Sequence, residues 1–340
     1  MNPILVETYR QGVLESFQRG VVCVVDREGE IIYSEGDVHQ ICYPRSAMKL
    51  LQVLPMLESG AMEHFDFTLE EIAVMCGSHN GEPEHQRVVT SILEKAGLTK
   101  DALRCGAQYP TDKETSNELI RKGQKPHAIH NNCSGKHAGF LAYCVYQGWS
   151  TEDYINPSHP AQQEILSTVA EMYKYPADKM VTALDGCSAP IFSVPVYNQA
   201  LGYKNLVEPS NFPQSRQDAC YTVIEAVSRY PHMVAGNKRY CTDMLQVCAP
   251  HIIGKTGAEG VYSLGLTVEK IGVAIKIDDG KQHAQYHVAQ RFIEATGLFS
   301  EEQLLPLKHY ERDEIKNFNK FITGELKTRD GLFDTLKIVY

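Results

Sequence analysis

Strand-like segments lie near both ends of this 340-residue chain, and helical periodicity dominates the long stretch between them. Residues 21–26 and 31–33 are rich in β-branched side chains and flank a turn around Gly29, which is typical of a β-hairpin. Residues 260–266 and 271–277 have the same character. This order predicts an α+β protein in which the terminal strands form one sheet and the central helices form a separate lobe.

Apolar side chains recur at helical spacing through the middle of the chain and once near its end. The predicted helices cover residues 46–58, 68–76, 82–96, 114–123, 136–148, 159–174, 214–229 and 280–296. We expect a sheet-containing lobe of residues 1–45 and 250–327 and a mostly helical lobe of residues 46–249, with the polar motifs at the cleft between them. Residues 321–326 are a candidate edge strand, and residues 328–340 carry no pattern that predicts structure.

The charge balance and the hydropathy pattern exclude several classes of partner. The chain has 33 basic and 42 acidic residues, a net charge of −9, which disfavours nucleic acids and anionic membranes as partners. No apolar run approaches the roughly 20 residues of a membrane span, and residues 1–8 do not resemble a signal peptide. The ten cysteines include no C-x-x-C pair, so they predict neither a disulfide framework nor a zinc ribbon. We therefore expect a cytoplasmic protein with a small-molecule substrate.

Ser46 and Lys49 are three residues apart at the predicted start of a helix, where their side chains would lie on one face. A serine hydroxyl becomes a nucleophile when a base removes its proton, and a buried lysine with a lowered pKa is one such base. The alternative is an N-cap serine followed by a surface lysine. The apolar residues on both sides of this turn favour burial and therefore a role for the lysine.

Two further segments combine glycines with reactive side chains. Ser78 and His79 lie between two glycines in residues 76–82, and His79 and His85 are weak candidates for metal ligands because their spacing is not diagnostic. Residues 254–260 resemble a phosphate-binding loop, but position 249 is alanine where that motif requires glycine. The Lys-Thr-Gly at 255–257, placed just before a predicted strand, is instead typical of serine acyl-transfer enzymes that also carry S-x-x-K.

Cys133 and Cys187 lie in polar, turn-prone segments. Cys133 precedes a predicted helix and lies near Lys136, which would lower the pKa of its thiol and make it either a nucleophile or a soft metal ligand. Cysteines 54 positions apart do not define a metal site by spacing, so two unrelated loop cysteines remain an alternative.

Taken together and in this order, five motifs resemble the L-asparaginase II family, of the rhizobial inducible type. They are residues 44–49, 76–79, 132–139, 185–187 and 254–260, and the similarity extends from the N-terminus to about residue 327. The resemblance implies a fold similar to serine β-lactamases and glutaminases, with an antiparallel sheet built from the two ends of the chain. It implies hydrolysis of L-asparagine to L-aspartate and ammonia.

The resemblance also assigns roles to individual residues. It implies two Ser-Lys tandems, Ser46 with Lys49 and Ser78 with Lys255. It implies a zinc ion bound by Cys133, Lys136 and Cys187, with water as a fourth ligand. The candidate substrate-binding residues in these motifs are Arg45 for the carboxylate, Asp185 for the ammonium group, His137 and Gly257. We expect Ser46 to attack the amide carbon while Lys49 takes its proton, although two tandems permit either serine to be the nucleophile.

Three alternatives remain open. The first is another serine amidohydrolase, such as a glutaminase or a hydrolase of β-lactams or D-amino peptides, because one methylene changes binding by only about 1–3 kcal/mol. The second is a zinc-binding protein without catalysis. The third is a cysteine hydrolase that pairs Cys133 with His130 or His137. In every case a closed homodimer is the expected assembly, since it is the commonest arrangement and the resemblance points to it too.

Overall fold

The computed structural model describes residues 1–338 and divides into two compact units. The sheet unit consists of Met1–Ala47, Val194–Glu208 and the chain from Val247 onward, and the helical unit consists of Met48–Ser193 and Pro209–Gln246. Residues 194–208 join the sheet unit because the helix they form packs on the sheet.

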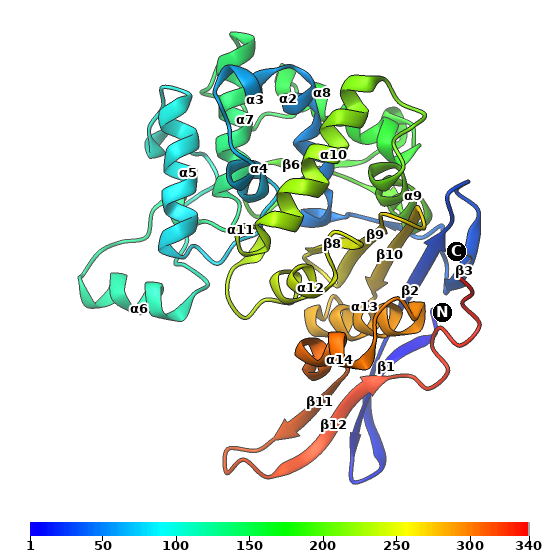
Figure 1. Ribbon diagram of the computed structural model, residues 1–340. Coiled ribbons are helices and arrows are strands. Elements are labelled where there is room, and N and C mark those ends of the chain that lie inside the picture. The colour runs from blue at the N-terminus through cyan, green and yellow to red at the C-terminus, as the bar shows by residue number, and fades with distance from the viewer. Residues whose placement is uncertain (339–340) are drawn as a thin grey trace. The chain divides into compact units, whose positions relative to one another are not determined.

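An antiparallel sheet of eight strands forms the centre of the sheet unit (Figure 1), which confirms the α+β class. Its order is β11-β12-β1-β2-β10-β9-β8, with β3 paired to β2. The strands are β1 (Ile4–Arg10), β2 (Val13–Val25), β3 (Ile31–Glu35), β8 (Ile252–Gly257), β9 (Val261–Leu266), β10 (Ile271–Ile277), β11 (Arg312–Lys316) and β12 (Ile322–Thr328). The remaining elements are β4 (Ile41–Cys42), β7 (Val194–Pro195), α9 (Val196–Val207), α13 (Gln282–Thr296), α14 (Glu301–Leu304) and the 3-10 helix η5 (Leu305–Tyr310).

The two ends of the chain meet in this sheet, as the sequence predicts. β2 pairs with β3 through the predicted hairpin and with β10 on its other side, where Val22 lies opposite Ile275. The sequence did not predict β1, β8 or β11. The Lys-Thr-Gly motif forms the end of β8, so it lies within a strand and not before one.

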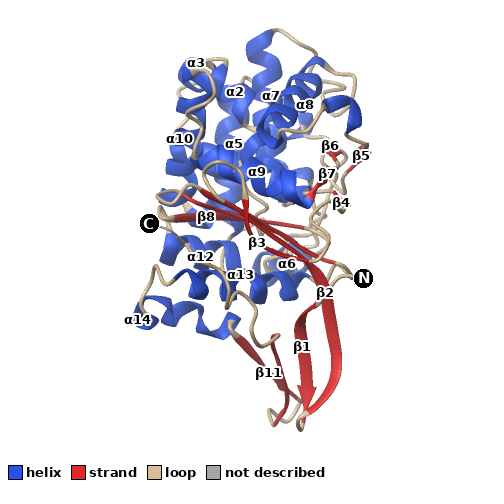
Figure 2. Ribbon diagram, turned by 90° about the vertical axis from the view of Figure 1, so that its right-hand side faces the viewer, coloured by secondary structure: helices blue, strands red, loops and turns tan. Residues whose placement is uncertain are grey.

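Helices cover both faces of the sheet, with α9 on one face and α13 on the other (Figure 2). The second half of β2 is therefore a continuous buried apolar run, which is typical of a strand covered on two faces. Gly272 permits the close approach of α9, because a Cβ atom there would lie 2.1 Å from the carbonyl oxygen of Ala200. Residues 194–208 are thus as much a part of this core as the strands.

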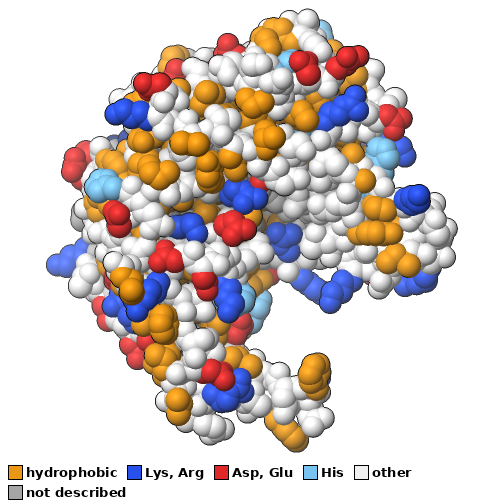
Figure 3. All heavy atoms as spheres, turned by 180° about the vertical axis from the view of Figure 1, so that it is seen from behind, with side chains coloured by type: hydrophobic (Ala, Val, Ile, Leu, Met, Phe, Trp, Pro, Cys, Tyr) orange, Lys and Arg blue, Asp and Glu red, His pale blue; other side chains and the backbone are white. Residues whose placement is uncertain are grey.

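The β1–β2 and β11–β12 hairpins extend beyond the part of the sheet that the helices cover. Their large apolar side chains are exposed, and Figure 3 shows hydrophobic groups at the ends of both hairpins. The exposed residues are Val13, Leu14, Phe17, Phe318, Phe321 and Ile322. Exposed apolar side chains often mark an interaction surface where they form a patch.

The helical unit contains most of the helices that the sequence predicts. They are α1 (Lys49–Gln52), α2 (Leu54–Glu58), α3 (Ala61–His64), α4 (Leu69–Met75), α5 (Pro83–Lys95), α6 (Lys113–Arg121), α7 (Ser134–Gln147), α8 (Pro160–Tyr173), α10 (Gln214–Arg229) and α11 (Pro231–Ala235). Shorter elements are the 3-10 helices η2 (Lys100–Ala102), η3 (Ala128–His130) and η4 (Ala177–Lys179) and the hairpin of β5 (Thr182–Leu184) and β6 (Pro190–Phe192). The 3-10 turn η1 (Arg45–Met48) and α12 (Tyr240–Cys248) cross from one unit to the other in sequence.

The helix expected over 46–58 consists of three pieces, η1, α1 and α2. Pro55 lies in the first turn of α2, where a missing N–H costs least and a new helix can begin. The short α1 buries Lys49 together with its apolar neighbours. Burial of this lysine, which the apolar context predicted, is therefore confirmed.

The helical unit is organised around α7, whose residues from Ser134 to Cys144 are all buried. Gly135 lets α4 pack directly against the start of α7, because a Cβ atom there would lie 2.2 Å from the carbonyl oxygen of Val74. A capping box between Thr68 and Glu71 fixes the other end of α4. This packing brings the loop after α4 next to the beginning of α7, and both segments carry predicted site residues.

Among the described residues, no helix combines the length and apolar character that a membrane span requires.

Candidate active site

The side chain of Lys49 contacts three polar groups of the helical unit. Its Nζ atom lies 2.5 Å from the carbonyl oxygen of Gly77, 2.9 Å from Ser78 Oγ and 3.2 Å from Cys133 Sγ. Both Lys49 and Ser78 are buried, with exposed fractions of 1% and 5%. A buried amine in contact with a hydroxyl is the pairing that Ser-Lys chemistry requires.

The sequence pairs Lys49 with Ser46, three residues before it, but the hydrogen bond found for Lys49 goes to Ser78. Periodicity could not reveal this, because the contact depends on where the loop after α4 places Ser78. Ser78 N donates to the carbonyl oxygen of Val234 over 2.8 Å, which fixes the backbone of that loop. Gly77 is required here, since a Cβ atom would lie 2.6 Å from the carbonyl oxygen of Met233.

Cys133 and Cys187 come together beside the two lysines of the helical unit. Lys136 Nζ lies 3.2 Å from Cys187 Sγ, and Cys187 Sγ lies 3.7 Å from Asp185 Oδ2. Ligand atoms of Cys133, Asp185 and Cys187 lie within 4.8 Å of one another. The alternative of two unrelated loop cysteines is therefore wrong.

The two thiols share a hydrogen bond, which moves their pKa values apart. The hydrogen bond from Cys133 lowers the pKa of Cys187 to about 5 against the effect of burial, and the nearby Lys136 acts in the same direction. The same hydrogen bond and burial raise the pKa of Cys133 to about 12. Burial disfavours the Lys136 ammonium, but the neighbouring sulfur atoms raise its pKa above the usual range. Cys187 is the thiolate of this group, and Cys133 is a thiol.

The chemistry of this donor set fits a zinc ion. Two sulfur atoms, one carboxylate and one amine approach one another, and zinc accepts all three kinds of donor atom. The resemblance placed water in the fourth position and gave Asp185 to the substrate's ammonium group. Its position beside Cys187 instead makes the Asp185 carboxylate a further candidate ligand. The spacing of Asp185 and Cys187 gave no signal for that.

His137, a predicted substrate-binding residue, is fully buried one turn after Cys133. The Tyr154 hydroxyl accepts from Arg104 N and also shares a hydrogen bond with His137 Nδ1, 2.8 Å away. His137 Nε2 is a buried atom without a protein partner among the described residues. Burial holds the pKa of this imidazole well below its usual range, so His137 is neutral.

The cysteine-hydrolase alternative receives no support from these contacts. Cys133 contacts Lys49, and a thiol with a raised pKa is a weak nucleophile. His130 Nδ1 accepts a hydrogen bond from the backbone of His127. A base for Cys133 would have to be another residue.

The other predicted site residues belong to the sheet unit. Ser46 is half-buried in η1, and the preceding Arg45 has a φ of 53°, a left-handed conformation that is uncommon for a side chain of this size. Lys255 is buried on β8, where its Nζ atom donates to the carbonyl oxygen of Thr256. Gly257 has a packing role, since a Cβ atom there would lie 2.3 Å from the carbonyl oxygen of Pro44.

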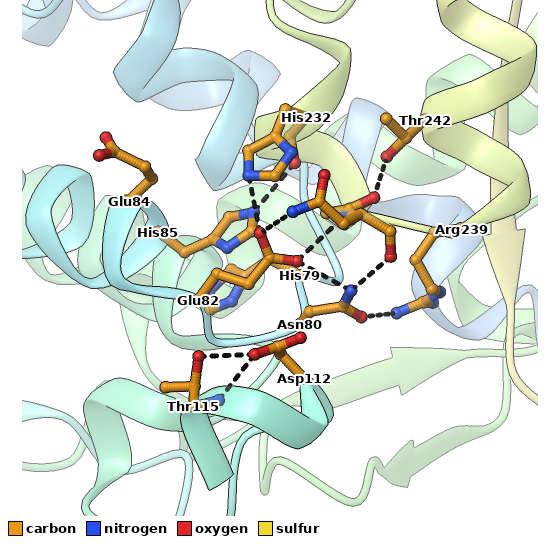
Figure 4. A network of polar contacts seen from close by, with 12 residues as sticks. His79, Asn80, Glu82, Glu84, His85, Asp112, Thr115, His232, Arg239 and Thr242 are labelled. Atoms are coloured by element: carbon orange, nitrogen blue, oxygen red, sulfur yellow. Dashed lines mark hydrogen bonds and ion pairs between the residues drawn. The ribbon is translucent and has the colours of Figure 1, made fainter. Parts of the chain in front are cut away.

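A second polar cluster follows Ser78 directly (Figure 4). His79, His85 and His232 stack on one another, with ring centroids 4.7 Å and 4.8 Å apart. His79 Nδ1 accepts from Gly81 N and His79 Nε2 bonds to Ser134 Oγ, so both ring nitrogens of His79 are occupied. Of the two histidines weakly predicted as metal ligands, only His85 belongs to a group with converging ligand atoms, together with Glu82 and His232.

Glu82 is the centre of this second cluster and is already saturated with donors. Its Oε1 atom accepts from Asn80 Nδ2 and Asn237 N, and its Oε2 atom accepts from Asn237 Nδ2 and contacts His232 Nε2. Asn80 Oδ1 accepts in turn from Arg239 over 2.8 Å. Arg239 lies outside every motif of the sequence. Its only signal is a cation in a short polar loop, which is common on any protein surface.

Comparisons with known proteins agree with the motifs. The family model described as L-asparaginase II matches residues 6–328. No curated protein matches the chain significantly. Similar solved structures include a β-lactamase from Mycobacterium bovis, with 13% identity, 78% of this chain and 89% of that chain covered, and a TM-score of 0.38. The D-alanine carboxypeptidase AmpC from Burkholderia cenocepacia has 14% identity, 78% and 90% coverage, and a TM-score of 0.38. The native form of Mglu has 14% identity, 84% and 67% coverage, and a TM-score of 0.42.

The family model spans nearly the whole described chain and contains all five motifs. The protein is an amidohydrolase, and it belongs to the L-asparaginase II family.

Proposed function

We propose that the protein is an L-asparaginase that hydrolyses the side-chain amide of L-asparagine to L-aspartate and ammonia by a Ser-Lys mechanism. The observation that carries this proposal is the contact of 2.9 Å between the buried Lys49 amine and the Ser78 hydroxyl, in a chain of this family. Amide hydrolysis needs a nucleophile and a base that later protonates the leaving amine. A lysine that passes between its neutral and charged forms supplies the base.

Ser46 is the nucleophile of this proposal. Its half-buried side chain is more accessible than that of Ser78, and it follows a residue with a left-handed backbone. Sparsely populated backbone conformations cluster at catalytic residues, where the surrounding structure maintains them. Ser46 Oγ attacks the amide carbon, Lys49 takes its proton and delivers it to the departing ammonia, and water then hydrolyses the resulting ester.

Ser78 and Lys255 support Lys49 in this scheme. A neutral Lys49 has two N–H groups, for Gly77 O and Cys133 Sγ, and one lone pair, which the Ser78 hydroxyl can occupy. Lys255 is the lysine that the resemblance pairs with Ser78, and its proposed role is to relay protons. The same Lys49–Ser78 contact favours a second assignment, in which Ser78 is the nucleophile.

We propose that Cys133, Cys187, Lys136 and Asp185 bind one zinc ion. When bound, the ion would fix the segments that carry these residues and supply positive charge near Lys49. Such a site is closer to a structural than to a water-activating centre, since two thiolates reduce the charge available at the metal. The His137 Nε2–H group is the proposed hydrogen-bond donor to the substrate.

We further propose that the protein works as a homodimer in a reducing compartment such as the cytoplasm. The exposed apolar residues of the β1–β2 and β11–β12 hairpins support self-association through these hairpins. All ten cysteines of the chain are free, which suits a reducing environment. A molar mass measured by light scattering that corresponds to two chains is expected, and a monomer would contradict the first part.

Ammonia release tests the proposed activity. The wild type and Ser46→Ala are compared on L-asparagine and L-glutamine, each with added zinc and after chelation. We expect activity on asparagine that Ser46→Ala abolishes. Equal or greater activity on glutamine would favour the glutaminase alternative. No activity of the wild type on either amide would leave the non-catalytic zinc-binding alternative.

A further inference from the structure

An asparaginase needs a cation that binds the α-carboxylate of its substrate. The candidate that the sequence motifs suggest for this role is Arg45. We propose that Arg239 binds the α-carboxylate of the amino acid substrate, in an orientation that Asn80 and Glu82 impose. This inference rests on the proposed function and adds the group that makes a free amino acid the preferred substrate. It requires only residues of the helical unit.

Arg239 lies directly beside the backbone of the candidate catalytic loop. Its Nη1 atom lies 3.5 Å from the carbonyl oxygen of Ser78 and 2.8 Å from Asn80 Oδ1. Ser78 is the residue whose hydroxyl contacts Lys49. In L-asparagine only two carbon atoms separate the α-carboxylate from the amide that reacts. A cation that recognises this carboxylate must therefore lie close to the catalytic groups, and Arg239 contacts the backbone of Ser78, whose hydroxyl contacts Lys49.

The guanidinium group retains donors for a ligand. Arg239 is half-buried, and both of its hydrogen bonds to described residues leave from Nη1. Within the described part of the chain, Arg239 forms no ion pair with any carboxylate. A guanidinium has five N–H donors in a planar fork that matches the two oxygens of a carboxylate. Nε and Nη2 are thus available to a substrate carboxylate.

The orientation of Arg239 is determined by a chain of hydrogen bonds that begins at Glu82 (Figure 4). Asn80 Nδ2 donates to Glu82 Oε1 over 3.1 Å and to the carbonyl oxygen of Asn237 over 2.9 Å. Both acceptors require the amide nitrogen on that side, so the amide oxygen must face Arg239. Asn80 and Glu82 are buried, and such a supported group is held in position before the ligand arrives.

Glu82 can fulfil this role because it does not compete for the arginine. Its two oxygens are occupied by Asn80, His232 and two donors of Asn237. Gly236 has a φ of 102°, and a Cβ atom there would lie 2.6 Å from Glu82 Oε1, so the loop before Arg239 closes tightly on this carboxylate. Asn80 therefore separates the Glu82 carboxylate from the guanidinium group of Arg239. The remaining N–H donors of the guanidinium group stay available to the ligand.

The test removes the carboxylate from the ligand and the guanidinium from the protein in turn. Arg239→Gln and Arg239→Lys are compared with the wild type on L-asparagine and on 3-aminopropanamide, the same molecule without its α-carboxylate. Inhibition by L-aspartate and by β-alanine, the matching pair of products, is measured alongside. Arg87→Gln is the control, since it removes an arginine with two carboxylate partners from the exposed surface of the same unit.

We expect Arg239→Gln to lower kcat/KM for L-asparagine by about 100-fold, mainly through KM, because a charge-assisted bidentate pair is lost. Arg239→Lys should lose about tenfold, because it keeps the charge without the fork. The inhibition constant of L-aspartate should rise in parallel. Activity on 3-aminopropanamide and inhibition by β-alanine should change less than about threefold, since neither ligand has an α-carboxylate, and the one carboxylate of β-alanine corresponds to the reacting amide.

Equal losses on both substrates and both inhibitors would overturn the proposal, because they would show a structural role for Arg239. An unchanged KM for L-asparagine in Arg239→Gln would overturn it as well. If 3-aminopropanamide is too poor a substrate for the wild type, the two inhibitors carry the same comparison. A wild type without activity on L-asparagine would instead contradict the proposed function itself.

Discussion

Two groups in the helical unit have the residue types of a metal site, and they differ in how strongly hydrogen bonds already occupy their ligand atoms. Cys133, Asp185 and Cys187 meet beside two lysines, while Glu82 and His85, which follow Ser78 closely in the sequence, meet His232. The Glu82 carboxylate accepts all the donors that it can hold, and His85 Nε2 bonds to the carbonyl oxygen of His232. The second group is therefore a support for the loop that carries Ser78, Asn80 and Arg239.

The difference shows that residue type alone does not define a metal site. A metal ion must offer its ligands more than the hydrogen bonds they already make. The contacts found for the thiols of the first group among the described residues are with each other, two ammonium groups and one carboxylate. Soft sulfur atoms gain most from zinc, whereas a carboxylate with four donors gains least.

The largest expected effect is the loss of zinc from a Cys133→Ser/Cys187→Ser double variant. Its affinity should fall by well over about 100-fold, because even residues that merely support metal ligands cost about 10- to 100-fold. Zinc content after dialysis and competition with a chromogenic chelator measure this. The control is a His85→Gln/His232→Gln variant, which should keep its zinc. If the cysteine variant keeps its zinc and the histidine variant loses it, the metal site is the second group and not the first.

The next effect is the dependence of zinc affinity on pH. Cys187 has a lowered pKa and is already a thiolate at neutral pH, whereas the raised pKa values of Cys133 and Lys136 mean that both hold protons there. Zinc must displace those protons from any of these residues that it binds, so affinity should increase as pH rises from 6 to 8.

If both residues are ligands, the increase should reach about 100-fold per pH unit, and it should be about tenfold if only Cys133 is. Calorimetry in buffers of different ionisation enthalpy counts the protons released. A zinc affinity that stays constant over this pH range would contradict the assignment of these ligands.

A smaller effect distinguishes Glu71 from Glu82, which are two buried carboxylates of the helical unit. Glu71 accepts from Thr68, Ser91 and Lys95, and Glu82 accepts from Asn80, Asn237 and His232. Each Glu→Gln change should lower the free energy of unfolding by about 1–3 kcal/mol, measured by urea denaturation. Only Glu82→Gln should also raise KM for L-asparagine, because only Glu82 orients Asn80 toward Arg239. A similar rise in Glu71→Gln would show that lost stability alone changes KM.

The smallest effect concerns the packing that places both groups. Gly135→Ala puts a methyl group against the backbone of Val74 and should cost about 1–3 kcal/mol of stability. Gly139→Ala meets the flexible side chain of Met75 at 3.0 Å and should cost less. Thermal unfolding of the two variants measures the difference. Equal costs would mean that α4 and α7 separate more easily than their packing indicates.

The sequence predicts the fold class and the motifs well because both depend on local patterns. The 21–26 and 31–33 hairpin is confirmed by the pairing of β2 with β3, and the α+β class by the sheet that joins the two ends. β11 was missed because its residues are mostly charged and exposed at the edge of the sheet, and β1 because its apolar residues form a short run that does not alternate with polar ones. The helix over 46–58 was too long because Pro55 begins a new helix.

The sequence predicted residues of the candidate site, but it did not predict which of them contact one another. Motifs supplied Lys49, Ser78, Cys133 and Cys187, but no spacing indicates that Lys49 contacts Ser78 and Cys133. Arg239 had no motif at all. Its position follows from a hydrogen-bond chain that joins segments more than 150 residues apart in the sequence. Such contacts arise from tertiary packing, which single-sequence patterns do not encode.

The most direct test of the account locates the covalent intermediate. The enzyme is quenched in acid during turnover of L-asparagine, digested and analysed by mass spectrometry, with Ser46→Ala and Ser78→Ala in parallel. The account predicts an aspartyl ester on the peptide that contains Ser46, absent from Ser46→Ala. An ester on Ser78, or a thioester on Cys133, with Ser46 unmodified would contradict it.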